Sequence, residues 1–409
     1  MLFPTGRVVL LASIATVANA AALSTVTLDY GTFTGLADTT NGIIYFRGVR
    51  YADPPVGDLR WRPRVYGNEC IATTQTATTS TTSEDCLFGN IYVPIATTAT
   101  SALPVLVFFH VFRKPLIFVT FEYRWGSLDS SGDPGSRRRP INAGLLDQKA
   151  ALMWVNGTLG NSAGPYSCYH LGPIAGAGST MFHLIGDAGA NTNLFHQAMG
   201  DSPSLSFLPH YSDAYVEDLF TQFAGLARTL ANRTSSLFPF APIADGSFIQ
   251  QRPVEAFRDG NFAHVPVLFG SNTNEGANWS ASLPDPLRTR QQMYGEMRYI
   301  CSAVMITGAA HDFGLNAYQY HSDHGAELYA FFDGTVVFDP ADQALVVAMR
   351  SYFTSFATSG APLARTILLG PNGSPRILLH PGDIILENVT DALSARCAFW
   401  HGLAAEIST

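Results

Sequence analysis

The chain has 409 residues, of which 47% are apolar and 14% are charged, with a formal net charge of −8. This composition excludes a disordered chain, and the length allows one large domain or two medium ones. The acidic balance argues against nucleic acid as a partner, because the longest basic run is only Arg137–Arg139, in a polar loop.

The first twenty residues have the pattern of a secretory signal peptide. Arg7 precedes the apolar stretch 8–18, and Ala18-Asn19-Ala20 suits cleavage. The stretch is too short to span a bilayer, so we expect residues 1–20 to be the signal and 21–409 the secreted, extracellular domain. A transmembrane span is not expected at 103–121 either, because charges and a proline interrupt it at 113–115.

Cysteines and glycosylation sequons suit the same compartment. In an oxidising compartment, the odd count of five cysteines leaves at least one unpaired. Cys70 and Cys86 flank the Thr-rich loop 73–82 and are our first choice for a disulfide. The pairing of the other three stays open, although Cys168 suits a small buried side chain; these are Cys168, Cys301 and Cys397. Four Asn-x-Ser/Thr sequons are typical of a secreted glycoprotein: Asn156, Asn232, Asn278 and Asn388.

Strand and helix patterns alternate along the chain. Short strands are expected within 26–65, and apolar strands at 85–94, 103–110, 116–125, 167–171 and 265–272. Helical periodicity marks 142–156, with Asn142 as N-cap, a helix from Gly176 onward, and helices at 214–231 and 339–360. This alternation predicts an α/β fold with a mostly parallel central sheet and helices on both faces.

Glycines 172, 176 and 178 follow a strand and precede a helix, as in a dinucleotide-binding turn. The short-chain dehydrogenases, which use this spacing, need a Tyr-x-x-x-Lys downstream, and no lysine follows Lys149. His321 and His324 lack the further ligand motif of a metal site and are expected to be loop residues. We therefore expect neither a metal nor an organic cofactor.

Several long motifs occur in one order over residues 26–400. They are YFRGVRYADPPVGDLRWRPR (45–64), SEDCLFGNIYVP (83–94), NAGLLDQKAALMWV (142–155), PIADGSFI (242–249), VPVLFGSNTNEGANW (265–279), HGAELYAFF (324–332) and RCAFW (396–400). In this respect the chain resembles the type-B carboxylesterase/lipase family, the cholinesterase-like branch of the α/β-hydrolases. The resemblance implies an α/β-hydrolase fold and hydrolysis of a small ester or lipid substrate through an acyl-enzyme.

By the same resemblance, Glu275 stands at the position of the catalytic acid and His324 at that of the base. His324 would take the proton of the attacking hydroxyl, and Glu275 would orient its ring and stabilise its cation. The N–H of Ala175 would donate to the oxyanion. The resemblance also implies a structural ion pair between Arg60 and Glu84 and a disulfide between Cys70 and Cys86.

Two parts of the family machinery are altered. Gly172 and Gly176 frame the family's Gly-x-Ser-x-Gly motif, but Ile174 occupies the serine position and carries no hydroxyl. A β-branched residue also tolerates the positive φ of that turn badly. The family's His-Gly-Gly-Gly oxyanion loop is missing, because Val111, Phe112 and Arg113 follow His110 directly.

Three other serines are candidates to replace the nucleophile. Ser162, in GNSAG, matches Gly-x-Ser-x-Gly, but it follows a helix and precedes a strand, the reverse of the required order. Ser179 is expected one turn into a helix, and Ser202 in an ordinary loop. Neither has a motif around it.

The sequence is therefore compatible with three hypotheses about function: an impaired esterase, a non-catalytic secreted binding module of the same fold, and the product of a gene model that dropped coding segments. The segments after His110, between 200 and 240 and between 280 and 295 are all shorter than in the family. Because these segments usually form the oxyanion loop and the gorge walls, acyl and alcohol specificity stay open. The oligomeric state stays open as well.

Overall fold

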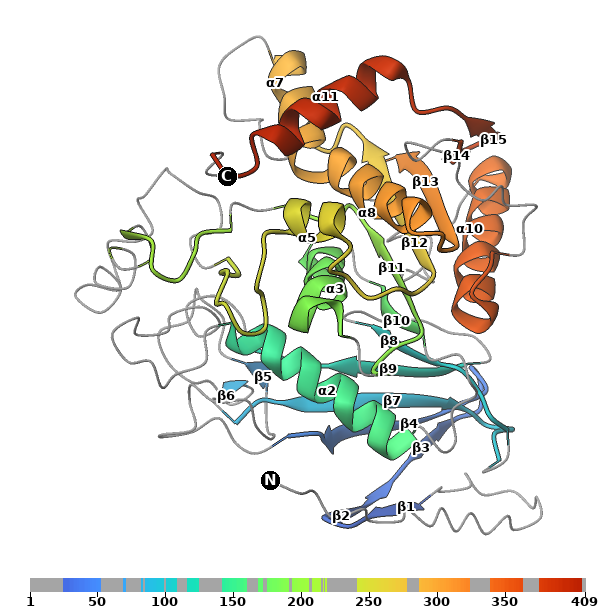
Figure 1. Ribbon diagram of the computed structural model, residues 1–409. Helices are drawn as coiled ribbons and strands as arrows, with labels where there is room; N and C mark the ends of the chain where they lie inside the picture. Colours follow the sequence, from blue (N-terminus) through green and yellow to red (C-terminus); the bar gives the residue numbers. More distant parts are fainter. Residues whose placement is uncertain are drawn as a thin grey trace.

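The structure is a computed structural model of the chain (Figure 1). It describes residues 25–52, 69–70, 82–83, 85–98, 101–108, 116–124, 142–159, 168–171, 175–190, 193–205, 208–214, 216, 218, 241–277, 287–323, 339–362 and 375–406.

A large mixed sheet organises the described residues, and a hairpin and a short two-stranded pair lie outside it. The sheet has 11 strands in the order β15-β14-β13-β12-β11-β10-β8-β9-β7-β4-β3. The strands are β1 (Thr25–Leu28), β2 (Gly31–Thr34), β3 (Leu36–Asp38), β4 (Ile43–Arg50), β5 (Glu69–Cys70), β6 (Thr82–Ser83), β7 (Phe88–Pro94), β8 (Val105–Phe108), β9 (Ile117–Phe121), β10 (Cys168–Leu171), β11 (Gln197–Asp201), β12 (Val267–Thr273), β13 (Ala317–Asp323), β14 (Arg376–His380) and β15 (Asp383–Glu387).

The centre of the sheet is parallel, from β9 across to β14, and both margins are antiparallel. Parallel strands are buried on both faces and read as continuous apolar runs, as in Val105–Phe108, where all four residues are buried. The predicted α/β class with a mostly parallel centre is confirmed.

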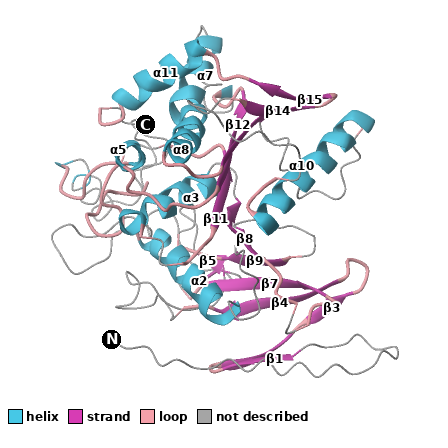
Figure 2. Cartoon of the chain, turned by 45° about the vertical axis from the view of Figure 1, so that its right-hand side comes forward, coloured by secondary structure: helices cyan, strands magenta, loops and turns pink. Residues whose placement is uncertain are grey.

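Helices cover both faces of the sheet. They are α2 (Ala143–Leu159), α3 (Ala175–Ile185), α5 (Pro253–Asp259), α7 (Leu287–Gly295), α8 (Cys301–Asp312), α10 (Pro340–Ser359) and α11 (Asp391–Gly402), with a 3₁₀ turn η2 (Gly186–Gly189) and a π-helical turn η4 (Glu296–Ile300). Figure 2 shows α10 on one side of the sheet and α2, α3, α5 and α8 on the other.

Two apolar clusters correspond to these faces. Under α10, Met349 and Phe353 pack with Met199 and Leu268 of the sheet. On the other face, Met181 of α3 and Ile306 of α8 belong to the larger cluster. Because side chains alternate along a strand, successive apolar residues of β11 and β12, such as Ala198 and Met199, belong to the two clusters alternately.

Most predicted elements are found with shifts of a few residues at their ends. The strand predicted at 265–272 is Val267–Thr273, and the helix predicted at 339–360 is Pro340–Ser359. Asn142 does precede α2, but its side chain bonds the backbone of Ile243 and the carboxylate of Asp245 and so anchors the loop at 241–250. The helix predicted at 214–231 lies almost entirely outside the described residues.

Two disulfides are present among the described cysteines. The expected bond between Cys70 and Cys86 is confirmed, with Cα atoms 4.7 Å apart. A second bond, which the sequence left open, joins Cys301 at the start of α8 to Cys397 in α11. It fixes the C-terminal helix to the helix that packs beside β12 and β13. The side chain of Cys168 lies outside the described part of the structure.

Candidate active site

The candidate site lies at the carboxyl ends of β11, β12 and β13. In an open α/β sheet the crevice beyond these strand ends is where ligands bind. Glu275 lies in the turn after β12, and its side chain is buried, with 1% exposed. The proposed acid therefore stands at the edge of the sheet where the fold places functional groups.

Two hydrogen bonds fix the carboxylate of Glu275. The backbone N–H of Asn272 donates to Oε1 at 2.7 Å, and the hydroxyl of Ser202 donates to the same oxygen at 2.6 Å. Ser202 follows β11 directly, is fully buried and has φ of 54°, which a non-glycine residue adopts rarely. Such a conformation persists only when the surroundings enforce it, and here it holds the hydroxyl against the acid.

A second carboxylate, that of Asp201, lies beside the first and is held by neutral donors. Its Oδ1 accepts from the Tyr320 hydroxyl at 2.8 Å. Its Oδ2 accepts from the amide of Asn272 at 2.9 Å and faces the Ser202 hydroxyl at 3.1 Å. Asn272 thus contacts both carboxylates, one through its side chain and the other through its backbone.

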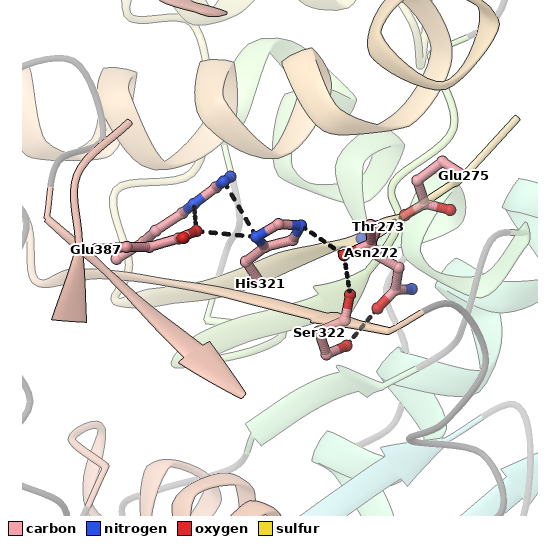
Figure 3. A network of polar contacts seen from close by, with 7 residues as sticks. Asn272, Thr273, Glu275, His321, Ser322 and Glu387 are labelled. Carbon is pink, nitrogen blue, oxygen red and sulfur yellow. Dashed lines mark hydrogen bonds and ion pairs between the residues drawn. The ribbon is translucent and has the colours of Figure 1, made fainter. Parts of the chain in front are cut away.

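Ser322 extends this network to β13, as Figure 3 shows. Its hydroxyl donates to the side-chain oxygen of Asn272, whose amide nitrogen is turned toward Asp201 and Ser202. We call these residues the carboxyl-edge cluster: Asp201, Ser202, Asn272, Glu275, Tyr320 and Ser322. All six are buried, so the orientation of the acid is set by three strands at once.

Close packing against the α7 region explains the glycine after the acid. A Cβ added to Gly276 would lie 2.0 Å from the carbonyl oxygen of Gln291, and one added to Gly295 would lie 3.0 Å from the Cβ of Glu275. Any side chain at 276 would push α7 away. The glycine after Glu275 therefore has a steric reason.

The nucleophile side of the site is described only at its margins. Strand β10 ends at Leu171 and helix α3 begins at Ala175, in the predicted strand-turn-helix order. The first N–H groups of a helix lack intrahelical partners, so that of Ala175 fits an oxyanion donor. Ile174 and the predicted base His324 lie outside the described residues, as do Ser162 and the segment after His110. The predicted contact between Glu275 and His324 therefore stays a prediction.

The remaining predicted residues divide in the same way. The ion pair of Arg60 with Glu84 lies outside the described residues, and so do the sequons at Asn232 and Asn278. Asn156, on α2, and Asn388, just before α11, are both exposed. These two positions are accessible as glycosylation requires.

Several residues of the cluster are not marked by any motif in the sequence. Ser202 does lie in the loop after β11, as predicted, but it is fully buried and its hydroxyl donates to Glu275. Asp201 and Asn272 were not singled out at all. A buried apolar strand that ends in Asp-Ser, and a second that ends in Asn before the Glu-Gly motif, were the available signals.

Within the described ranges, no group of three or more His, Cys, Asp or Glu side chains is arranged to hold a metal ion. The helices described there include none with the length and apolarity needed to cross a bilayer.

The mostly parallel central sheet with helices on both faces is the fold of the α/β-hydrolases. Residues 22–227, just over half of the chain, match the model of the carboxylesterase family, and the chain belongs to that family. The crystal structure of Aspergillus niger EstA superposes with a TM-score of 0.79 at 25% identity, covering 94% of this chain and 99% of that one.

Curated relatives are similar at lower coverage. The fumonisin B1 esterase of Sphingopyxis macrogoltabida is 29% identical over 58% of this chain and 54% of its own length. Lipase 2 of Diutina rugosa is 28% identical over 65% of this chain and 64% of its own length. The chain thus spans a little over half to just under two thirds of these relatives.

Proposed function

We propose that this chain is a secreted protein of the carboxylesterase family that binds carboxylic esters but has lost turnover through the family's catalytic triad. The proposal rests on one observation above all: Ile174 occupies the position where the family's serine attacks the ester. An alkyl side chain has neither a lone pair nor a proton to transfer, so no acyl-enzyme can form there.

The acid side of the site supports an origin in catalysis. Glu275 is buried and held by two donors, one of them a serine in a rare backbone conformation. A group prepared in this way suits orientation of an imidazole, and His324 is the candidate that follows β13. In this proposal the acid and base remain, while the attacking group has been replaced.

A second loss reinforces the first. Without the glycines after His110, the N–H of Ala175 is the one oxyanion donor that we assign from the family pattern. Loss of a single donor costs about 10²–10³ in rate, and loss of a triad serine about 10⁶. We therefore expect the parent chain to show no steady-state hydrolysis above background through this triad.

The secreted state is supported by three independent features. The N-terminal segment has the composition of a signal peptide, two disulfides are formed, and Asn156 and Asn388 present exposed sequons. Disulfides persist in oxidising compartments, which the extracellular space provides.

A non-catalytic binding module is the second candidate. The observation in its favour is that the fold is built around an ordered sheet and two disulfides although the nucleophile is gone. It predicts that the folded, secreted chain stays inert even when the hydroxyl is restored, because its gorge no longer admits an ester.

The test restores the hydroxyl. We expect Ile174→Ser to hydrolyse 4-nitrophenyl acetate weakly but measurably, and a further His324→Ala to abolish this hydrolysis. Release of nitrophenolate over many turnovers is the measurement. Ser162→Ala in the parent and in the Ile174→Ser background is the matched control and should change nothing.

Three results would count against the proposal. Parent turnover that survives His324→Ala would mean that the chemistry does not come from this triad. Parent turnover lost on Ser162→Ala would identify the serine that we set aside. A well-folded Ile174→Ser chain with no hydrolysis would favour the binding module.

A further inference from the structure

A second constellation of nucleophile, base and acid types lies on the same edge of the sheet, beside the carboxyl-edge cluster. Thr273 ends β12, His321 lies on the neighbouring β13, and Glu387 ends β15. Figure 3 shows the imidazole between the other two side chains, with one ring nitrogen directed to each.

The distances form a continuous relay. The Thr273 hydroxyl lies 3.2 Å from Nε2 of His321, and Nδ1 of the same ring lies 2.9 Å from Oε1 of Glu387. A hydroxyl on one ring nitrogen and a carboxylate on the other is the arrangement that activates a hydroxyl nucleophile. The hydroxyl has a longer alternative at the Ser322 carbonyl, 3.4 Å away.

This constellation is separate from the carboxyl-edge cluster. In the register of β12 and β13, Ser271 lies opposite His321 and Asn272 opposite Ser322. Because side chains alternate between faces, Thr273 and His321 project from one face, and Asn272 and Ser322 from the other. The two networks therefore share strands but not side chains.

The imidazole is flanked by opposite charges. Among the described residues, the charged groups beside it are Glu387 and Arg376, which comes from β14. Arg376 donates from Nε to Glu387 Oε1 at 2.6 Å, while its Nη2 lies 3.2 Å from Nδ1 of His321. The shorter contact assigns the guanidinium to the carboxylate, which leaves Nδ1 to donate to Glu387 and Nε2 to accept from the hydroxyl.

The carboxylate keeps its charge in this setting. Burial alone would raise the pKa of Glu387, but the Arg376 guanidinium and the His321 ring together lower it below its usual value. An ionised carboxylate beside the ring favours the protonated imidazole that forms when the base takes a proton.

Access decides whether such a group can react. Thr273 is exposed, the side chain of His321 is 18% exposed and that of Glu387 is 28% exposed. Arg376 is the buried member, with 8% of its side chain exposed. Thr273 thus lies at the surface, His321 and Glu387 are partly enclosed, and Arg376 is buried behind them.

We propose that Thr273 is an acyl-acceptor site activated by His321, with Glu387 as the positioning residue. The Thr273 oxygen attacks the carbonyl carbon of an activated carboxylic ester and forms a new ester bond, while the bond to the leaving alkoxide or phenoxide breaks. The hydroxyl proton passes to Nε2 of His321 and from there to the leaving group or to water. No oxidant, reductant or metal takes part.

The expected product is a single acyl group per chain rather than turnover, because the alkyl ester formed on Thr273 is much less reactive than the activated aryl ester that supplies the acyl group. This distinguishes the site from the triad position of the proposed function. Acylation here needs neither residue 174 nor His324, so it should survive His324→Ala in the parent background.

The test exposes the folded parent chain to 4-nitrophenyl acetate and locates the acetyl group by mass spectrometry of peptides. We expect one acetyl group on Thr273, none there in Thr273→Val, and retention in Thr273→Ser, which keeps the hydroxyl. In His321→Gln the rate of acetylation should fall on the order of 10²-fold, the usual contribution of a general base.

Matched controls use residues with similar exposure and no relay. Thr27→Val removes an exposed hydroxyl that bonds Thr32 within the described residues, and His311→Gln removes a partly exposed imidazole beside Asp312. Neither should change acetylation at Thr273. Circular dichroism of each variant identifies any loss of folding.

The role of Glu387 is tested by a pH profile. Removing a carboxylate beside an imidazole lowers the imidazole pKa, so Glu387→Gln should shift the rise in acetylation rate to lower pH. A merely structural role would lower the rate without moving the profile. A folded parent chain with no acetyl group on Thr273, or acetylation unaffected by His321→Gln, would overturn the proposal.

Discussion

Two buried polar clusters of this fold satisfy their charges in opposite ways. Beneath α2, Asp147 receives two hydrogen bonds from the Arg124 guanidinium, at 2.5 and 2.6 Å, and both side chains are almost fully buried. At the carboxyl edge, Asp201 is held by the Tyr320 phenol and the Asn272 amide, both of them neutral.

The difference separates a structural tie from a prepared functional group. An ion pair with two parallel bonds fixes α2 to the segment after β9 that contains Arg124, but leaves the carboxylate little capacity for another partner. Neutral donors fix the direction of a carboxylate without cancelling its charge, which is what orientation of an imidazole requires. Under the proposed function, this criterion makes the carboxyl edge, with Glu275 held by the Ser202 hydroxyl and the Asn272 N–H, the candidate remnant of the family's catalytic site.

The largest expected effect comes from breaking the ion pair. Burial raises the pKa of Asp147 although Arg124 opposes the shift, so desolvation is the dominant effect on this carboxyl group. In Asp147→Asn the buried guanidinium loses its counter-charge, which should lower the free energy of unfolding by about 3–5 kcal/mol. Urea denaturation of the purified chain measures it.

A matched exposed pair provides the control. Asp259→Asn removes the partner of Arg258 at the surface, 2.7 Å away, and should leave unfolding unchanged within error. An apolar replacement of both buried partners, Arg124→Met with Asp147→Leu, should recover most of the loss. An equal effect of Asp147→Asn and Asp259→Asn would mean that the buried ion pair is not the structural tie described above.

Much of the fold was accessible from the sequence, since buried strands such as Val105–Phe108 and Val267–Thr273 are short apolar runs between turn residues. The C-terminal strands were harder. In β13, polar Gln319 and His321 alternate with buried Tyr318 and Tyr320. This segment therefore lacks the continuous apolar run that marks β8 and β12. The non-local order of the parallel strands also cannot be read from local periodicity.

The candidate site was predicted in outline only. Family motifs identified Glu275, but the donors that hold it come from other strands, about 70 residues away in the case of Ser202. No local pattern marks such partners, because a parallel sheet brings together strand ends that are distant in sequence. The relay through His321 and Glu387 was missed for the same reason.

The second prediction concerns pH and a buried histidine between α2 and α3. His183 of α3 bonds Gln148 at 3.0 Å, and burial, with Lys149 nearby, lowers its pKa from 6.5 to about 3. The unfolded chain therefore binds a proton below pH 6.5 that the folded chain does not. Stability from this group is complete above that pH and is lost as the pH falls toward 3.

Between pH 7 and pH 5 this linkage corresponds to about 2 kcal/mol. His183→Gln should lose that much less stability over the interval than the parent, as measured by denaturation at each pH. His264→Gln, an exposed histidine bonded to a backbone carbonyl, is the control and should keep the parental slope. Parallel pH curves for the parent and His183→Gln would show that the buried ring is not the titrating group.

The smallest expected effect on stability, and the most specific on chemistry, comes from Ser202→Ala. The change removes one of the two identified donors to Glu275 and leaves the Asn272 N–H in place, so unfolding should be easier by roughly 1–2 kcal/mol. Ser247→Ala, which removes an exposed serine bonded to Asp245, should have a smaller effect.

In the Ile174→Ser background, Ser202→Ala should also slow hydrolysis of 4-nitrophenyl acetate, because a less firmly held acid orients the base less well. If hydrolysis were unchanged while stability fell, the carboxyl-edge cluster would be a structural tie like the one beneath α2, and the contrast between them would fail.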